Sequence, residues 1–174
     1  MRCAVFSQRR RSSRGTRRAR RAASQLVLDE AQHKQIRSVS DLVPAASRRV
    51  GCTIKVVTVA PDEIATDGLT VEDESTSDFL IHVSMAAPLE VTLAHELGHI
   101  VLGHGGCYSI EDLAHQARHD GLALWHQAFD DALRSQGAMV EREADAFADQ
   151  ILHLLEYARA GVSIQGLRWA IGNS

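Results

Sequence analysis

His95, Glu96 and His99 form a His-Glu-x-x-His pattern inside an apolar run that extends from 91 to 102 and that we predict to be a helix. Histidines four residues apart lie on one face of a helix, so both can direct a ring nitrogen at one metal ion. Glu96, the next residue after the first histidine, is placed to accept a proton from a water molecule that the metal activates. The pattern therefore predicts the chemistry of a zinc hydrolase.

The alternative is a surface helix that happens to carry two histidines and a glutamate. Four large apolar residues make this helix mostly apolar, namely Leu93, Leu97, Ile100 and Val101. Charged groups on a buried helix are costly unless they are paired or bind a metal. The composition thus favours a metal site over a surface helix.

A second predicted helix, starting at Met139, offers the third ligand. Glu141 and Asp145 share one face of it, whereas Glu143 points about 160° away from Asp145 and is expected in solvent. One carboxylate from this helix would complete a three-ligand site with one open position, as a catalytic zinc requires. A second carboxylate one turn on can accept the N–H of a ligand histidine. The alternative is an acidic helix face near its own N-terminus.

His104 is a further histidine close to the motif. It lies about 900° of helical rotation beyond His95, on the opposite face, so we expect a helix-end residue and not a ligand. The longer metzincin pattern is absent, because Leu102 and Gly105 stand where it needs glycine and histidine. Cys107 is expected to be a passive thiol. A helical region predicted over 110–133 adds three candidates for an electrophile, among which the sequence does not choose: His115, His119 and His126.

The elements around the motif predict an α+β fold. Helices are expected from about 18 to 37 and from an N-cap at Asp41 to a stop at Gly51. Strands rich in β-branched residues are expected at 52–60, 69–71 and 79–83, before Pro88 and Glu90 open the motif helix. Three strands without room for crossover helices predict an antiparallel sheet. The expected fold is therefore mostly helical with a small three-stranded antiparallel sheet.

Composition limits the class of protein. The 174 residues suit a globular protein, with 45% apolar and 24% charged residues. No run approaches the ~20 apolar residues of a membrane helix. The three cysteines are odd in number and form no Cys-x-x-Cys pair, which favours a reducing, cytoplasmic location.

The charge is unevenly distributed. Residues 1–24 carry nine arginines and no acid, whereas the remaining residues carry ten Lys and Arg against 22 Asp and Glu. Residues 1–16 are predicted to be a disordered Arg-rich tail, and 17–174 a single domain. The tail could make the chain a nucleic-acid-binding module or be a solvated extension. The acidic body argues against nucleic acid as a partner.

Two motifs taken together resemble a known family. They are His95-Glu96-Leu97-Gly98-His99 with Leu102 and His104, and, about 40 residues later, Glu141-x-Glu143-Ala144-Asp145-x-Phe147-Ala148. This combination resembles the ImmA/IrrE family of zinc metallopeptidases over roughly Ala22 to Leu155, and leaves the Arg-rich tail unmatched. The second motif also looks like the glutamate motif of gluzincin-type peptidases. The family often has asparagine where Asp145 stands.

The resemblance implies a zincin-like domain with specific residue roles. By likeness, the zinc ligands are His95, His99 and Glu141, the catalytic residue is Glu96, and Asp145 supports a ligand histidine. Members typically act in bacterial or phage regulation by inactivating a helix-turn-helix repressor, which implies a zinc-dependent endopeptidase. The alternative is a zinc-holding regulatory protein that binds a repressor without cutting it. We further expect an extended substrate to pair with a sheet edge at 79–83.

Overall fold

The computed structural model describes residues 3–64, 66–73, 76–104 and 126–172, without the side chains of 3–12, 73 and 126–136. Its elements in chain order are α1 (Cys3–Ala31), η1 (Val39–Leu42), α2 (Val43–Val50), β1 (Ile54–Val59), β2 (Gly68–Asp73), β3 (Asp78–Ser84), α3 (Leu89–Leu102), α5 (His126–Arg159) and α6 (Ile164–Gly172). The described residues form an α+β fold, which confirms the predicted class. The three predicted strands and the motif helix are all present.

The sheet is mixed, so the predicted antiparallel sheet is wrong. Its strand order is β1-β3-β2, in which β2 and β3 pair antiparallel and β1 and β3 pair parallel. After β1 the chain skips one strand position and runs back as β2. It then reverses again, and β3 fills the position between β1 and β2. Because β2 itself makes the return, the parallel pair needs no crossover helix. The prediction had assumed that neighbours in sequence are neighbours in the sheet.

The central position of β3 also corrects the expected docking edge. Phe79 to Val83 pair with β1 on one side and with β2 on the other, so this segment has no free edge. The strands with a free edge are β1 and β2. Any added strand must therefore pair with one of these two.

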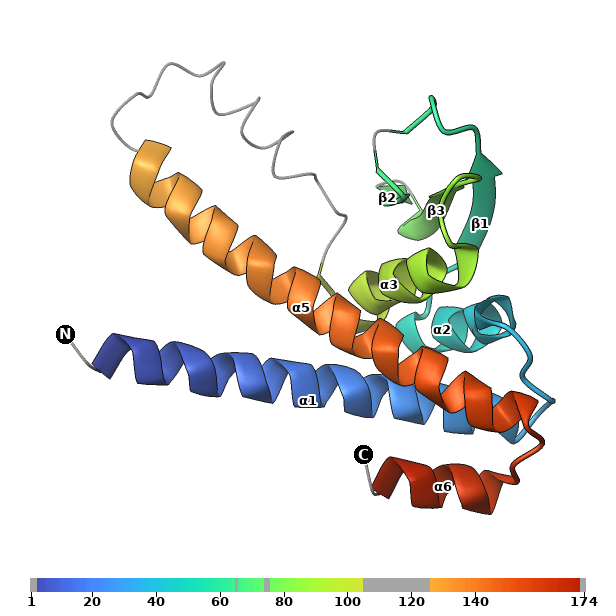
Figure 1. The fold of residues 1–174 in the computed structure, drawn as a ribbon. Coiled ribbons are helices and arrows are strands. Elements are labelled where there is room, and N and C mark those ends of the chain that lie inside the picture. The colour runs from blue at the N-terminus through green and yellow to red at the C-terminus, as the bar shows by residue number, and fades with distance from the viewer. Residues whose placement is uncertain (1–2, 65, 74–75, 105–125, 173–174) are drawn as a thin grey trace.

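The helices form a layered core beneath the sheet (Figure 1). α3 lies between the sheet and α5, and most of its side chains are buried. α1 and α5 lie side by side and run in the same direction. Gly15 adjoins Glu143 near the middle of both helices, and Arg159 at the end of α5 donates to the carbonyl of Arg37, which follows α1. α6 packs against both. No helix in the described ranges is both long and apolar enough to cross a membrane.

α1 begins at Cys3, which differs from the predicted disorder of residues 1–16. Arginine is among the stronger helix formers, so a run of arginines can continue a helix that is anchored elsewhere. The anchor is the contact with α5, where Gly15 leaves room for the Glu143 side chain. α5 likewise begins at His126 and not at Met139. Residues 105–125, in which most of the helix expected at 110–133 falls, lie outside the described part of the chain.

The turn before α2 differs in one capping residue from the prediction. Ser38 is the N-cap of η1, the short helix that leads into α2. Asp41, which was expected as the N-cap, stands three residues after Ser38. The Asp41 carboxylate accepts the backbone N–H groups of Arg37 at 2.9 Å and Ser38 at 3.0 Å. The hydrogen bond from the Arg37 backbone is the largest cause that lowers the pKa of Asp41. Gly51, in the left-handed region at φ 77°, ends α2 as predicted.

Candidate metal centre

The two helices that carry the candidate ligands approach each other closely at Gly98. A Cβ atom at this position would lie 3.2 Å from the Ala144 Cα and 3.2 Å from the Phe147 Cδ1 of α5. Without that atom, the backbone of α3 can rest directly on α5. This close approach places His95 and His99 opposite Glu141.

The three predicted ligands converge at one place. His95 Nε2 lies 2.9 Å from His99 Nε2 and 3.1 Å from a Glu141 carboxylate oxygen, and the other oxygen lies 3.7 Å from His99 Nε2. One candidate atom from each residue falls within 4.8 Å of the other two. Ligand atoms around a tetrahedral zinc with bonds near 2.0–2.1 Å are about 3.4 Å apart. The spacing of the three residues therefore suits a zinc ion.

These contacts perturb the titration of both partners. The hydrogen bond between His95 and Glu141 is the largest cause that raises the pKa of His95. Hydrogen bonds from His95 and His99 lower the pKa of Glu141 well below its usual range. The carboxylate of Glu141 is thus held in the ionised form that a metal ligand requires.

Asp145 lies behind His95, in the place that the family resemblance implies for it. Its carboxylate is 3.0 Å from His95 Nδ1. A carboxylate can only accept, so this contact keeps a ring proton on Nδ1, and Nε2 presents a lone pair once its own proton gives way to a metal. That lone pair faces His99 and Glu141.

A different pair of residues lies behind His99: His104 follows the end of α3, as predicted, but not on the opposite face, and the prediction that Glu143 is in solvent is wrong. His104 Nδ1 is 3.3 Å from His99 Nδ1, and His104 Nε2 is 3.4 Å from a Glu143 oxygen. The predicted opposite-face position of His104 fails because α3 ends at Gly103, which turns the chain at φ 70° and brings the His104 N–H onto the His99 carbonyl. Glu143 is buried and not in solvent, because α1 covers its side of α5.

This arrangement also indicates which ring nitrogen of His99 faces the site as an acceptor. Burial is the largest cause that lowers the pKa of His104, which favours the neutral ring with a single N–H. His104 donates that N–H to Glu143, so its Nδ1 accepts the N–H of His99 Nδ1. His99 Nε2 then also carries a lone pair toward the centre. Two imidazole nitrogens and one carboxylate within a few ångströms repel one another unless protons or a metal cation lie between them, and this donor set suits zinc.

Glu96, the predicted catalytic residue, is buried and faces β2. Thr70 donates its hydroxyl to one Glu96 carboxylate oxygen at 2.6 Å. Gly68 makes room for the other oxygen, since a Cβ there would lie 2.8 Å from it. No hydrogen bond or ion pair joins Glu96 to the three converging residues in the described part of the chain, although its charge contributes to the raised pKa of His95. The sequence reasoning missed Thr70, whose position follows from the pairing of β2 and not from any motif.

Several other candidates fall where the structure gives no side chains. Cys107, His115 and His119 lie outside the described residues, and His126 is described only as the first residue of α5. No protein-family model, no curated protein and no solved structure matches this chain. The geometry of the site therefore carries the functional argument by itself.

Proposed function

We propose that this protein is a cytoplasmic zinc-dependent endopeptidase of the ImmA/IrrE type. The observation that carries the proposal is the convergence of His95, His99 and Glu141, with the outer nitrogen of each histidine already engaged by a partner. Such outer contacts orient ligand histidines and raise their basicity in metal sites. A chance cluster of acids and histidines has no need for them.

In this proposal His95, His99 and Glu141 hold the zinc ion and leave one position open. Bound zinc supplies Lewis-acid chemistry, which lowers the pKa of a water molecule and polarises the scissile carbonyl. With zinc bound, Glu96 would accept a proton from the attacking water and would later deliver it to the leaving amine. The Thr70 hydroxyl holds one oxygen of Glu96, and the other oxygen remains for proton transfer.

The substrate edge in this proposal is β2. A peptide that adds to the free edge of this strand would lie next to Glu96, because Thr70 belongs to β2 and contacts its carboxylate. β1, the other strand with a free edge, packs beside α2 instead. We propose a helix-turn-helix repressor as the substrate, which rests on the resemblance of the motifs.

The experiment compares wild type with Glu96→Gln against the helix-turn-helix protein encoded nearby. The variant should retain about one equivalent of zinc by mass spectrometry, whereas cleavage should fall by about 10²–10⁴-fold, the usual contribution of general acid–base catalysis. Glu156→Gln, an exposed change on α5 outside the proposed site, is the matched control and should cleave normally. Cleavage that survives in Glu96→Gln, or in wild type after chelation, would overturn the proposal.

A second candidate is a zinc-holding protein that binds a repressor without cutting it. The observation in its favour is that Glu96 is engaged by Thr70 and forms no hydrogen bond with the converging residues in the described part of the chain. The same assay separates the two functions. Repressor that is retained by zinc-loaded protein and stays intact would support this second candidate.

A further inference from the structure

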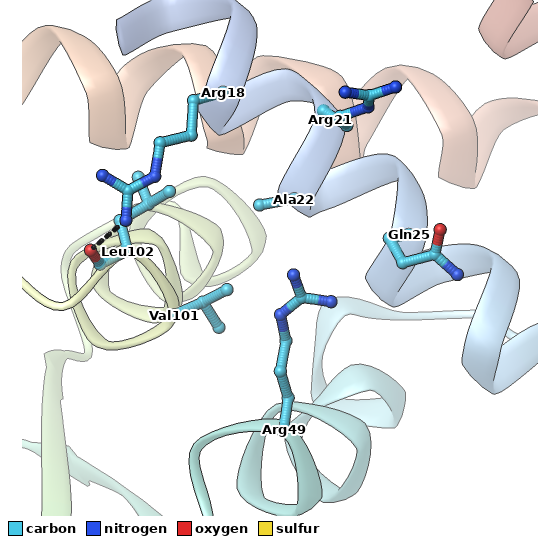
Figure 2. A pocket seen from close by; sticks show the side chains of 7 residues that line it. All are labelled: Arg18, Arg21, Ala22, Gln25, Arg49, Val101 and Leu102. Atoms are coloured by element: carbon cyan, nitrogen blue, oxygen red, sulfur yellow. Dashed lines mark hydrogen bonds between the residues drawn. The ribbon is translucent and has the colours of Figure 1, made fainter.

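Two cavities adjoin the basic surface of α1. The first, of about 340 Å³, lies between α1, α2 and the end of α3, and Figure 2 shows Arg49 extending from α2 into it while Arg18 reaches across to the Leu102 carbonyl. Val101 and Leu102 give it an apolar wall. The second, of about 530 Å³, is lined by Arg17 and Arg20 of α1 and extends to α5 and α6.

The two cavities share Arg21 and Gln25. Viewed down the axis of α1, with 3.6 residues per turn, the average direction of the residues that line the first cavity differs by about 90° from that of the residues that line the second. Arg21 and Gln25 lie between these two directions. The cavities are therefore neighbours on one continuous basic face of α1.

The charge of this face is not neutralised within the described part of the chain. Among the described residues, no aspartate or glutamate lines either cavity. No described group forms a hydrogen bond or ion pair with the guanidinium groups of Arg17, Arg20, Arg21 and Arg49. Arg18 donates to the Leu102 carbonyl at 3.4 Å through one nitrogen, which leaves further N–H donors on its fork. Guanidinium groups that have no acid partner are suited to an anionic ligand.

A buried donor without a partner lines the second cavity. Gln150 of α5 is only 6% exposed, and its side-chain Nε2 has no hydrogen-bond partner. Buried amide groups are rarely left unpaired, because the lost hydrogen bonds to water are not replaced. The buried Ser24 lies at the same cavity. An acceptor that enters the cavity and meets a slightly rotated Gln150 amide would satisfy this donor.

We propose that these adjoining cavities bind a phosphate ester, with Arg21 as the shared contact. The planar fork of arginine matches two phosphate oxygens, and a charged ligand with an apolar or aromatic body suits cavities that combine arginines with aliphatic walls. His95, His99 and Glu141 line neither cavity, so the proposal does not depend on the proposed peptidase activity. A free nucleotide and a nucleic-acid backbone share this chemistry.

The test measures binding to the full chain by titration calorimetry at constant low salt. The probes are inorganic phosphate, adenosine 5′-monophosphate and a short single-stranded deoxyadenylate oligonucleotide. Arg21→Gln should weaken binding by about tenfold or more, because it removes a charge-assisted contact and keeps a good helix former. Arg168→Gln removes the same charge from an exposed position of α6 outside both cavities, and should change the affinity by less than about twofold. Arg49→Gln on α2 is a second variant in case Arg21→Gln does not fold.

Gln150→Leu is the sharper variant. It removes the unpaired amide, so binding should weaken while the melting temperature stays unchanged or rises. His95→Ala should bind phosphate as wild type does. Saturable binding of the mononucleotide assigns a free nucleotide, and saturable binding of the oligonucleotide alone assigns a nucleic-acid backbone, provided that Arg21→Gln weakens it. The proposal is overturned if no probe binds or if Gln150→Leu leaves the affinity intact. It is also overturned if Arg21→Gln and the control Arg168→Gln weaken binding equally.

Discussion

The two histidines of the candidate metal centre are supported in opposite ways. Behind His95 stands Asp145, whose side chain is 66% exposed, and behind His99 stand His104 and Glu143, whose side chains are 9% and 12% exposed. Both arrangements hold a proton on Nδ1, so that each Nε2 can present a lone pair to a metal at the same point. The exposed support needs only the packing of α3 on α5, whereas the buried support also needs the turn at Gly103 and the cover that α1 provides.

The comparison shows that the same role, holding a proton on one ring nitrogen of a histidine, can depend on very different amounts of surrounding structure. Water can replace Asp145, because its surroundings are open. Water has little access to His104 or Glu143, so the loss of either leaves a buried polar group without a partner. Mutations on the His99 side should therefore change stability and metal affinity together, and mutations on the His95 side should change metal affinity alone.

The largest expected difference is between His99→Ala and His95→Ala. Each removes one of three ligands, so each should lower zinc affinity by about 100-fold or more. Only His99→Ala should also lower the free energy of unfolding, by about 2–3 kcal/mol, because it leaves a cavity and an unpaired His104. Urea denaturation in the presence of a chelator measures this without the contribution of bound metal. Equal destabilisation by both variants would contradict the comparison.

The next difference is between His104→Ala and Asp145→Ala. Both should lower zinc affinity by about 10–100-fold, as the loss of a group behind a metal ligand commonly does. His104→Ala alone should cost about 2 kcal/mol of unfolding free energy, since it leaves the Glu143 carboxylate buried without its partner. Adding Glu143→Leu should recover part of that loss. If the double variant is less stable than His104→Ala, Glu143 has another role.

A smaller effect is expected from Gly15→Ala in α1. The added Cβ would lie 2.0 Å from a Glu143 oxygen, so the carboxylate must move away from His104. Alanine favours a helix over glycine by about 1 kcal/mol, which offsets part of the cost of separating Glu143 from His104, so the unfolding free energy should fall by about 1 kcal/mol or less. Zinc affinity, measured by competition with a chelator, should fall a few-fold. Gly172→Ala in α6, where the added atom meets nothing within 4 Å, is the control and should leave zinc affinity unchanged.

The smallest effect concerns Asp41, another carboxylate with a local hydrogen-bonding role. Because its pKa is lowered from 3.8 in the folded protein, it stabilises the fold at neutral pH, and this contribution is lost as the pH falls below about 4. Asp41→Asn should cost about 1 kcal/mol at pH 7, in the range for a helix cap. Denaturation curves of both proteins should approach each other as the pH is lowered to 3. A constant difference would show that the charge plays no part.

The parts of the site that the sequence predicts correctly are those set by local geometry. The four-residue spacings of His95 with His99 and of Glu141 with Asp145 place each pair on one helix face, and the structure brings the two faces together. Gly51 likewise ends its helix where the sequence predicts.

The parts that failed depend on contacts between distant segments. Glu143 is buried because α1 covers it, and the charge of residues 1–16 had suggested disorder and not a helix. His104 could not be placed by helical phase, because the helix ends one residue before it. The sheet order, and with it the position of Thr70 beside Glu96, depends on how strands pair, which alternation along one strand does not specify.

The position of α5 has a consequence for how the protein is made. Chains emerge from the ribosome N-terminus first, so α1, the sheet and α3 are complete before α5 appears. Until then the apolar residues that later pack against α5, such as Leu26 and Leu97, lack the side chains of that helix as packing partners. Glu141 is also not yet present. A nascent chain that stalls before α5 would therefore be prone to aggregate and would lack one of the three converging residues. The final third of the chain closes the core and completes the candidate metal centre in a single step.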